Sequence, residues 1–319
     1  MEKIANFIKK SQNIAILAHY KTDCDAVCSS LSLKLALESI GKKADVLIDS
    51  NLSFQMQTLP YWDSINKKTI EKYDCYVCLD TATQERLGKN KFKIMKNRQI
   101  SVALDHHATN EKFCKLNYVN EEYSSTCELL FDFFNLLNIK ISKDMAKLML
   151  TGIYTDTGKL SYNNAKPKTM SIVSSLLKIY GEPISNVCEP IFSNKTMGEF
   201  ELTKFVYSNL ELYENNQIAY LAINREDFKK LNTTIEDTHG LTDVGMSLAC
   251  VKVMILASQD DVEDCYYVSI RSKGTISARK IGEAFGGGGH VNASGCKIFD
   301  NAKNVKEMLI SEAKKVLKW

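Results

Sequence analysis

His19-Tyr20-Lys21-Thr22-Asp23-Cys24-Asp25 is the stretch that decides the fold of this chain, because it separates a predicted strand from a predicted helix. An apolar run over residues 14–18 comes before it, and apolar residues at helical spacing follow it until Gly41 ends the helix. One imidazole and two carboxylates therefore gather at the carboxyl end of a strand. Open α/β sheets bind their ligands at that end.

Two interpretations of this stretch are open. His19, Asp23 and Asp25 offer nitrogen and oxygen ligands close together, which suits a divalent metal ion. Alternatively, Asp25 caps the helix at its N-terminus and the remaining residues form a polar loop. The stretch alone favours neither interpretation, so the decision depends on the rest of the chain.

Three further apolar runs predict strands, over residues 44–48, 73–79 and 100–104. Apart from Asp45, Asp74 and Ser101 they are apolar rather than alternating, which is typical of strands that are buried on both faces. We therefore expect an α/β fold in which a mostly parallel sheet carries helices on both faces.

Polar side chains follow the later strands as they follow the first. Asp80 comes after the third strand, and Asp105-His106-His107 follows the fourth. Residues 125–128 are typical of a helix start, and a later predicted helix carries Asp156 on its core-facing side, where a carboxylate is costly unless something pairs with it. Two divalent cations would neutralise this crowded charge, and in two-metal sites such ions lie about 3.5–4 Å apart and clamp an in-line displacement at phosphorus.

The overall composition is that of an ordinary globular protein. The chain has 319 residues, of which 45% are hydrophobic and 25% charged, and this length favours two domains. Its net charge is only +3, so it lacks the basic excess of proteins that bind long duplex nucleic acid. A net charge of +3 is still compatible with a local pocket that binds a small anion.

The cysteines indicate a reducing compartment. Ten of them are scattered without a compact disulfide spacing, and we find neither a secretory signal nor a membrane-spanning run. We therefore expect a cytoplasmic protein with no membrane contact. Cys75 and Cys78 form a CxxC, but in a strand these residues point to opposite faces, which predicts two core thiols rather than a zinc or redox site.

The second half of the chain predicts a smaller α/β domain. We expect a catalytic domain over residues 1–188, a connecting segment over 189–208 and a second domain over 209–319, across a cleft from the first. Short predicted strands and helices fill this second domain.

The most unusual sequence in the second half is Gly286-Gly287-Gly288-Gly289-His290. A flexible linker is one interpretation of such a run, but a helix pattern and a polar Asn/Ser stretch frame it. Glycines also let backbone N–H groups surround a phosphate. Arg271 ends a predicted strand nearby and is suited to bidentate phosphate contact, although spacing alone would equally allow a surface arginine.

These residues together resemble a known family, the DHH phosphoesterases. The resemblance rests on four motifs in order: His19-x-x-x-Asp23-x-Asp25, Asp80-Thr81, Asp105-His106-His107 and Thr155-Asp156-Thr157-Gly158. Phe285 to His290, with Ala293 and Gly295, is similar to the signature of the DHH-associated C-terminal domain. Length and arrangement most resemble the bifunctional oligoribonuclease and 3′-phosphoadenosine 5′-phosphate phosphatase group.

The resemblance implies two divalent ions, Mn²⁺ in this family, and a role for each motif residue. It implies that His19 and Asp23 bind one ion, that Asp25, His106 and Asp156 bind the other, and that Asp80 bridges both. Asp105 would orient these ligands, and His107 would act on the scissile phosphate as a proton donor or charge stabiliser. Substrate would be held by the second domain, through Arg271, Gly286, Gly287, Gly288, Gly289 and His290.

The chain departs from the family pattern in two places. Cys24 and Cys28 stand where family members usually have glycine, and Lys21-Thr22 replaces the frequent Asn-Pro. These changes affect the shape of the loop and not the ligands.

The resemblance implies hydrolysis of short RNA and of 3′-phosphoadenosine 5′-phosphate, by a possible homodimer. A phosphodiesterase for cyclic or linear dinucleotides is an alternative with the same core. Inorganic pyrophosphatases share the metal motifs but not the glycine signature. A nucleotide-binding regulator that has lost catalysis is an alternative of another class, which would be expected to lack a ligand, and none of the ligands is missing here.

Overall fold

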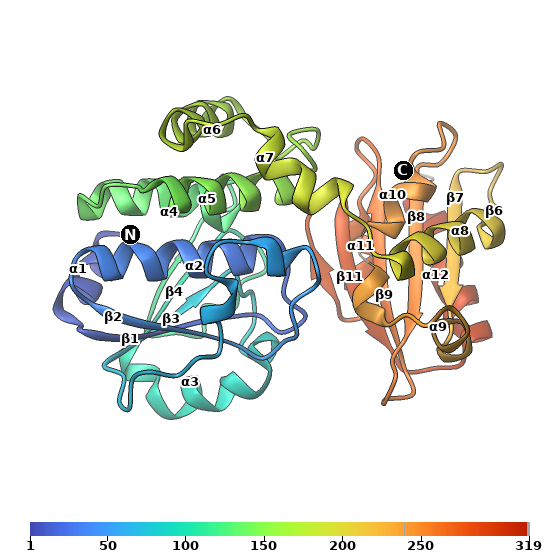
Figure 1. Cartoon of the computed structure of the whole chain (residues 1–319). Helices are drawn as coiled ribbons and strands as arrows, with labels where there is room; N and C mark the ends of the chain where they lie inside the picture. Colours follow the sequence, from blue (N-terminus) through green and yellow to red (C-terminus); the bar gives the residue numbers. More distant parts are fainter. Residues whose placement is uncertain (239, 318–319) are drawn as a thin grey trace. The chain divides into compact units, whose positions relative to one another are not determined.

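The structure is a computed structural model that describes residues 1–238 and 240–317. It divides into two compact units, Met1–Asn194 and Lys195–Trp319, each with its own sheet and core (Figure 1). The predicted domain limits, with a connecting segment over residues 189–208, stay a prediction.

The first unit is built on a sheet of five parallel strands in the order β2-β1-β3-β4-β5. The strands are β1 (Asn13–Ala18), β2 (Lys43–Ile48), β3 (Cys75–Leu79), β4 (Ser101–Asp105) and β5 (Leu116–Val119). The predicted parallel sheet is confirmed. The edge strand β5 was not predicted, because its residues are only half-buried and form no continuous apolar run.

Helices cover both faces of this sheet, as predicted (Figure 1). On one face lie α1 (Glu2–Lys10), α2 (Cys24–Ser39), α4 (Thr126–Leu137) and α5 (Lys143–Asp156), followed outward by α6 (Pro167–Tyr180) and α7 (Ser185–Cys188); on the other lies α3 (Lys91–Asn97). Short helical turns occur at Met56–Thr58, Trp62–Ser64, Glu85–Asn90, Arg98–Ile100 and Glu189–Ser193. Cys75 belongs to the core on the α2 face and Cys78 to the core on the α3 face, so the prediction of two core thiols on opposite faces is confirmed.

The register of the parallel strands fixes where the polar strand ends lie. Leu17 pairs with Cys78, and Cys78 pairs with Ala103. Two residues further along each strand, the chain reaches His19, Asp80 and Asp105. Because parallel strands run side by side in one direction, these three residues come to the same edge of the sheet.

The second unit contains a mixed sheet in the order β10-β11-β9-β8-β7-β6. Its strands are β6 (Glu211–Tyr213), β7 (Ile218–Ile223), β8 (Val253–Gln259), β9 (Tyr266–Ser272), β10 (Gly288–Gly289) and β11 (Ala293–Ile298). Its helices are α8 (Met197–Asn209), α9 (Arg225–Leu231), α10 (Leu241–Met246), α11 (Ala278–Glu283) and α12 (Ala302–Leu317), with a short turn at Ile235–Thr238. A smaller α/β unit was predicted here, and the element types are confirmed.

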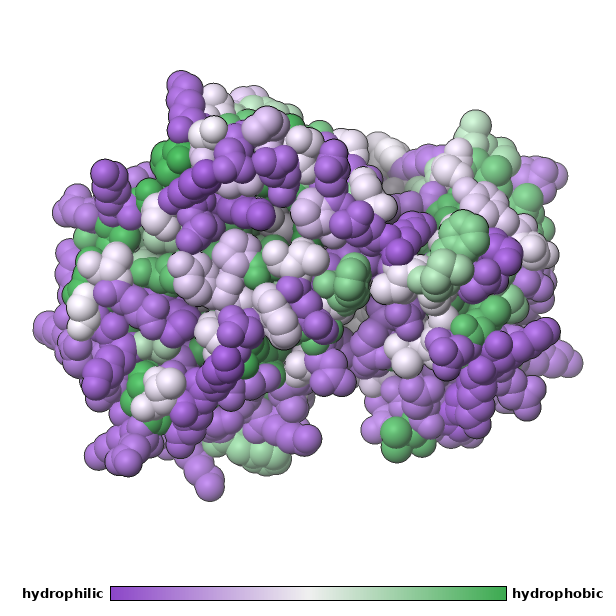
Figure 2. Space-filling model, viewed as in Figure 1, coloured by the Kyte–Doolittle hydropathy of each residue, from purple (hydrophilic) through white to green (hydrophobic). Residues whose placement is uncertain are grey.

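The face of the molecule that is seen in the space-filling view of Figure 2 is mainly polar. Hydrophilic residues dominate the face that Figure 2 shows, with small hydrophobic areas scattered among them. Within the part of the chain that the structure describes, no helix is both long and apolar enough to cross a membrane.

A buried carboxylate stabilises the edge of the first sheet. Asp45 on β2 is only 1% exposed. It accepts hydrogen bonds from Thr69 N at 2.9 Å, Thr69 Oγ1 at 2.7 Å, Ile70 N at 3.0 Å and Tyr73 Oη at 2.8 Å. These bonds attach the segment before β3 to β2, because each donor lies on that segment.

We expect Asp45→Asn to lower the free energy of unfolding at pH 7 by about 2–4 kcal/mol. The side-chain amide of asparagine would place its own N–H donors against the buried donors that now bond to the carboxylate. Each buried group left without a partner costs about 1–3 kcal/mol. Urea unfolding measures this difference. Tyr73→Phe is the control, since it removes one of the four bonds and should cost about 1 kcal/mol; equal losses in the two variants would contradict the account.

The loss should also depend on pH. Burial alone would raise the pKa of Asp45, but the hydrogen bonds from Thr69, Tyr73 and Ile70 outweigh burial and hold this pKa below its ordinary value. A carboxyl with a lower pKa in the folded state stabilises the protein above its unfolded pKa of about 3.9. The difference in the free energy of unfolding between wild type and Asp45→Asn should therefore be largest above that pH. It should decrease as the pH falls through the pKa of Asp45 in the folded state.

Candidate metal centre

Two groups of ligand atoms form at the edge of the first sheet, and Asp80 belongs to both. His19, Asp23 and Asp80 each offer one ligand atom, and these atoms lie within 4.8 Å of one another. The same holds for Asp25, Asp80 and His106. The structure thus brings together residues that follow three different strands.

The two carboxylate oxygens of Asp80 face different imidazoles. Its Oδ2 lies 3.8 Å from His19 Nε2, which is also 3.5 Å from Asp23 Oδ2. Its Oδ1 lies 3.4 Å from His106 Nε2, which is also 3.2 Å from Asp156 Oδ2. Asp80 therefore stands between two ligand sets, one on each side of its carboxylate.

The N-cap of the helix after β1 lies two residues earlier than the capping interpretation placed it. Helix α2 begins at Cys24, and Asp23 is its N-cap, accepting a hydrogen bond from Ala26 N at 3.0 Å. Asp25 lies inside the first turn and is fully buried. The alternative in which Asp25 caps this helix is therefore wrong, because its carboxylate is directed at another element.

That element is the N-terminus of α4. Asp25 Oδ2 accepts from Thr126 N at 2.6 Å, and Asp25 Oδ1 accepts from Cys127 N at 3.0 Å. The first N–H groups of a helix have no partner within the helix and attract negative charge. Asp25 is thereby fixed in place while its remaining lone pairs stay available to a cation.

Neighbouring carboxylates and burial shift the pKa values of the groups in the centre. Burial and the neighbouring Asp80 and Asp156 raise the pKa of Asp25 well above its ordinary value. Burial likewise raises the pKa of Asp156, against the opposing effect of His106. Burial alone would lower the pKa of His106, but the carboxylates of Asp156 and Asp80 beside its Nε2 outweigh burial and raise this pKa.

The donor set fits divalent cations. Asp156 Oδ2 is buried and accepts no hydrogen bond of good geometry from the described residues, even though His106 Nε2 lies 3.2 Å away. Buried polar atoms normally have a partner, and crowded carboxylates with imidazoles are ligands for hard or borderline divalent metals. The residues that could hold such ions are His19, Asp23, Asp25, Asp80, His106 and Asp156.

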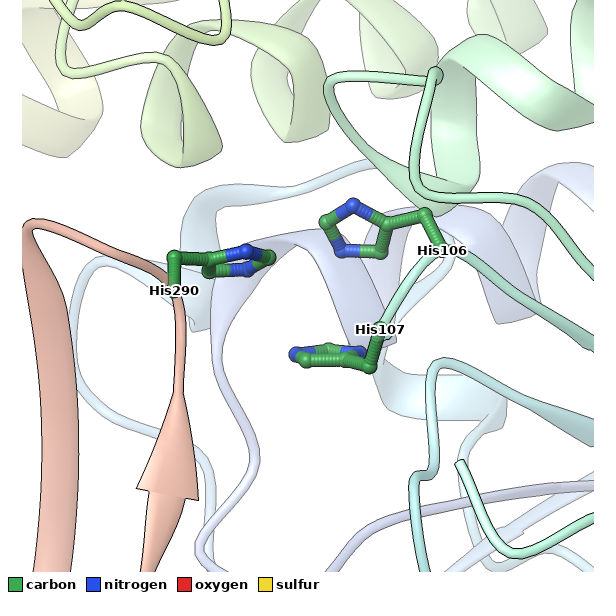
Figure 3. Close-up of side chains that lie close together, drawn as sticks. All are labelled: His106, His107 and His290. Atoms are coloured by element: carbon green, nitrogen blue, oxygen red, sulfur yellow. The ribbon is translucent and has the colours of Figure 1, made fainter. Parts of the chain in front are cut away.

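Asp105 orients the two histidines that follow it. Its Oδ1 accepts from the backbone N–H groups of His106 at 2.8 Å and His107 at 3.2 Å, and lies 2.8 Å from His107 Nδ1. Its Oδ2 accepts from Asn110 Nδ2 at 2.7 Å. Figure 3 shows the two rings, whose centroids are 4.5 Å apart, side by side after β4.

The Asp105–His107 pair is electrostatically coupled. Burial would raise the pKa of Asp105, but the adjacent His107 outweighs burial and lowers it. Burial would lower the pKa of His107, and Asp105 outweighs it in turn and raises it. This arrangement favours a protonated His107 beside an ionised Asp105.

Two residues of the centre were missed by sequence reasoning. Thr126 Oγ1 donates to Asp80 Oδ1 at 2.9 Å, although its sequence context indicated only a helix start. Arg86 Nη2 lies 3.3 Å from His19 Nδ1, and no motif marks it. Nothing in the sequence could have identified Arg86, because the contact depends on the fold of the segment after β3.

The close contact of α5 with Asp25 gives a prediction at Gly152. A Cβ atom added there would lie 2.4 Å from Cys127 Sγ and 2.6 Å from Asp25 Oδ1. We expect Gly152→Ala to displace Asp25 and to weaken Mn²⁺ binding roughly tenfold or more, with an overpacking cost of about 1–3 kcal/mol. Isothermal titration of metal and urea unfolding measure the two effects.

Gly41→Ala is the matched control. Gly41 has φ +77°, and a Cβ atom there would meet nothing within 4 Å. This variant should lose stability through backbone strain alone and keep its metal affinity. If Gly152→Ala bound Mn²⁺ as tightly as Gly41→Ala does, the contact with Asp25 would not matter.

In the second unit the glycine run is part of a sheet. Gly288–Gly289 form β10 and pair with Gly295 and Ser294 on β11, so the linker interpretation is excluded. A Cβ atom at Gly287 would lie 2.1 Å from Gly295 O, and one at Gly289 would lie 2.4 Å from Ala293 O. These glycines therefore permit close backbone packing, while Gly286, with φ +71°, has open space around it.

Arg271 and His290 lie on the same sheet as this hairpin. Arg271 on β9 is opposite Ala293 on β11, and its Nη1 donates to Ile270 O at 3.1 Å. His290 N donates to Ala293 O at 2.7 Å and closes the turn between β10 and β11. The structure thus gathers the predicted substrate-binding residues into one part of the second unit.

Comparisons with known proteins agree with this organisation. Residues 13–153 match the model of the DHH family, N-terminal domain, and residues 215–318 match that of the DHHA1 domain. The chain is 29% identical over 314 residues to the "probable bifunctional oligoribonuclease and PAP phosphatase NrnA" of Streptococcus mutans, covering 98% of this chain and 97% of that protein. It is 28% identical to the "bifunctional oligoribonuclease and PAP phosphatase NrnA" of Thermus thermophilus, over 93% and 88% of the two chains.

A solved structure shares the fold. The crystal structure of an exopolyphosphatase-related protein from Bacteroides fragilis superposes with a TM-score of 0.87 at 24% identity, covering 98% of this chain and 95% of that one.

Proposed function

Because the chain belongs to the DHH phosphoesterase family, with a DHH domain followed by a DHHA1 domain, we propose that it hydrolyses short oligoribonucleotides and 3′-phosphoadenosine 5′-phosphate. The observation that carries this proposal is the position of Asp80, with one carboxylate oxygen in each of two ligand sets. A carboxylate shared in this way suits a two-metal phosphoesterase. The relatives that bear the same two activities in their names match nearly the whole chain.

The proposed cofactor is a pair of Mn²⁺ ions. His19 and Asp23 would hold one ion, and Asp25, His106 and Asp156 the other, with Asp80 between them. When bound, two such ions would lower the pKa of water and stabilise the negative charge that develops at the phosphate. The support is the fit of the donor set, including the unpartnered Asp156 Oδ2.

The protein residues around the centre would position and transfer protons. Thr126 and the N-terminus of α4 hold the carboxylates of Asp80 and Asp25 in place. Asp105 accepts from His107 Nδ1, so Nε2 is the nitrogen from which His107 would donate a proton to the leaving oxygen. Asp105 raises the pKa of His107 above its ordinary value, which favours the proton-bearing ring that a general acid needs.

The second unit would bind a substrate phosphate through Arg271 and His290. We expect His290→Ala and Arg271→Ala to lower kcat/KM for nucleotide substrates roughly ten- to hundredfold, because each would lose one charge-assisted contact. Metal binding should be unchanged, since the six proposed ligands, His19, Asp23, Asp25, Asp80, His106 and Asp156, all lie in the first unit. Steady-state kinetics with a nucleotide and with a small chromogenic phosphodiester measure the effect.

The chromogenic phosphodiester is the control for this prediction. It lacks the second phosphate of the nucleotide substrate, which Arg271 and His290 would bind away from the metal centre. Equal losses on both substrates would indicate general damage and refute the binding role. Valine at Gly287 or Gly289 would be a poor test, since a side chain there collides with β11.

One turnover panel tests the proposed function. Dinucleotides to pentanucleotides labelled at either end, 3′-phosphoadenosine 5′-phosphate, and linear and cyclic dinucleotides are compared in the presence of Mn²⁺. We expect hydrolysis of the short RNAs and of the bisphosphate nucleotide. Turnover restricted to cyclic or linear dinucleotides would favour the phosphodiesterase alternative, and binding without turnover would favour a regulator.

A further inference from the structure

A second candidate binding site lies on the α3 face of the first sheet. A cavity of about 360 Å³ is lined by residues of β2, β3, α3 and the segment before β3. Two of these residues lie just before strands: Tyr73 is two residues before the start of β3, and Ile100 is one residue before the start of β4. The cavity therefore lies toward the opposite ends of these strands from Asp80 and Asp105, and no candidate metal ligand lines it.

The cavity is electropositive. Lys68, Lys72 and Lys93 line it against a single carboxylate, that of Glu71. Within the described residues, no carboxylate lies within 4.0 Å of any of the three ammonium groups, and Lys93 Nζ donates to Asn90 Oδ1. Burial lowers the pKa of Lys93, and the positive charge of Lys68 acts in the same direction against the opposing Asp49. An anion would relieve this repulsion.

The walls of the cavity are fixed by buried hydrogen bonds. Asp45 holds Thr69, Ile70 and Tyr73, so the segment that carries Lys68 and Lys72 is attached to β2. On the other side, Asn90 Nδ2 donates to Leu47 O at 3.1 Å and attaches the start of α3 to β2. The cavity is thus formed before any ligand binds, which lowers the cost of binding.

One side of the cavity is apolar and aromatic. Leu47, Ile100 and Tyr76 line it, and the Tyr76 ring packs edge-on against Tyr73 with centroids 5.6 Å apart. Binding sites for small molecules combine such apolar surfaces with a few placed polar groups, and occupy about 300–1,000 Å³. At the small end of that range, this cavity has room for a single nucleotide rather than an oligonucleotide.

We propose that this cavity binds a nucleoside monophosphate, with its phosphate on Lys68 and Lys93 and its base against Tyr76. Lysine binds phosphate as a point charge, and the tyrosine pair offers a ring surface beside the charges. The site is separate from the metal centre and does not depend on the hydrolytic activity.

Isothermal titration of the full-length protein with AMP tests this proposal, both with Mn²⁺ and with EDTA in excess. EDTA removes any binding that the metal centre supports, and the lysine variants of the cavity distinguish the remaining binding from binding at Arg271 and His290 in the second unit. We expect one AMP site to persist in EDTA. Inorganic phosphate should bind there at least tenfold more weakly than AMP, because it lacks the base.

Lys68→Met with Lys93→Met is the test variant, and Lys96→Met is its matched control. Lys96 lies exposed on the same helix as Lys93 and does not line the cavity. The double variant should bind AMP about tenfold more weakly for each lysine removed, and the control should bind as wild type does. If the double variant fails to fold, Lys68→Met alone is measured instead. Lys68 lies on an exposed segment, and this single change should weaken AMP binding about tenfold.

Three results would overturn the proposal. They are no AMP binding by wild type in EDTA, equal AMP affinity in wild type and the lysine variants, and phosphate binding as tight as AMP binding.

Discussion

Replacing Asp80 by alanine is expected to lower kcat/KM for short oligoribonucleotides by roughly a thousandfold or more. Asp80 contributes to both ligand sets, with Oδ2 3.8 Å from His19 Nε2 and Oδ1 3.4 Å from His106 Nε2. Its loss should disturb both ions, and bound metal typically contributes several kcal/mol of transition-state stabilisation. Steady-state kinetics and the stoichiometry of Mn²⁺ binding measure the two consequences together.

Asp105→Ala is the comparison variant. Asp105 contacts His107 and the backbone of His106 and acts on the ligands only through them. Loss of such an orienting partner typically costs about 10–100-fold. A variant Asp80→Ala that kept near-native turnover and bound two metals would refute the bridging role, and so would a larger loss in Asp105→Ala.

Metal removal is expected to abolish hydrolysis and also to lower stability. The metal-free protein keeps Asp25, Asp80 and Asp156 close together, where burial and the charges of Asp80 and Asp156 raise the pKa of Asp25. A ligand that binds only the folded state at one hundred times its Kd adds about 2.7 kcal/mol to stability. Treatment with EDTA should therefore lower Tm as well as activity, and added Mn²⁺ should restore both.

Activity measurements test separately whether a metal is required and whether that metal is Mn²⁺. Full activity in metal-stripped protein with chelator present would refute the metal requirement. Recovery with Mg²⁺ as good as with Mn²⁺ would refute the assignment of Mn²⁺ and leave the two-metal site intact. Gly152→Ala offers an independent check, because it should shift the metal dependence without removing a ligand.

The parallel sheet and most of the centre could be predicted because both depend on local sequence. Mainly apolar runs marked β1 to β4, and parallel strands bring the residues after them to one edge. The edge strand β5 lacked such a run. Asp25 was assigned a possible capping role, and its true partner on α4 lies about a hundred residues later in the chain.

Contacts between distant segments could not be predicted. Thr126 is 46 residues from Asp80, and Arg86 is 67 residues from His19. The glycine run was interpreted as a phosphate cradle, whereas Gly287 and Gly289 are also required where two backbones approach each other. A pattern of residue types indicates neither pairing partners nor approach distances, because both arise from tertiary packing.

The aligned strand ends make the centre sensitive to the length of the chain inside the strands. Deleting one residue from β3 would withdraw Asp80 by about 3.3 Å and turn each side chain between the deletion and Asp80 to the opposite face. Insertions between residues 49 and 68, which join β2 to the segment held by Asp45, leave every strand end where it was. Natural length variation among relatives should therefore be found in that connection and be absent from the strands that lead to His19, Asp80 and Asp105.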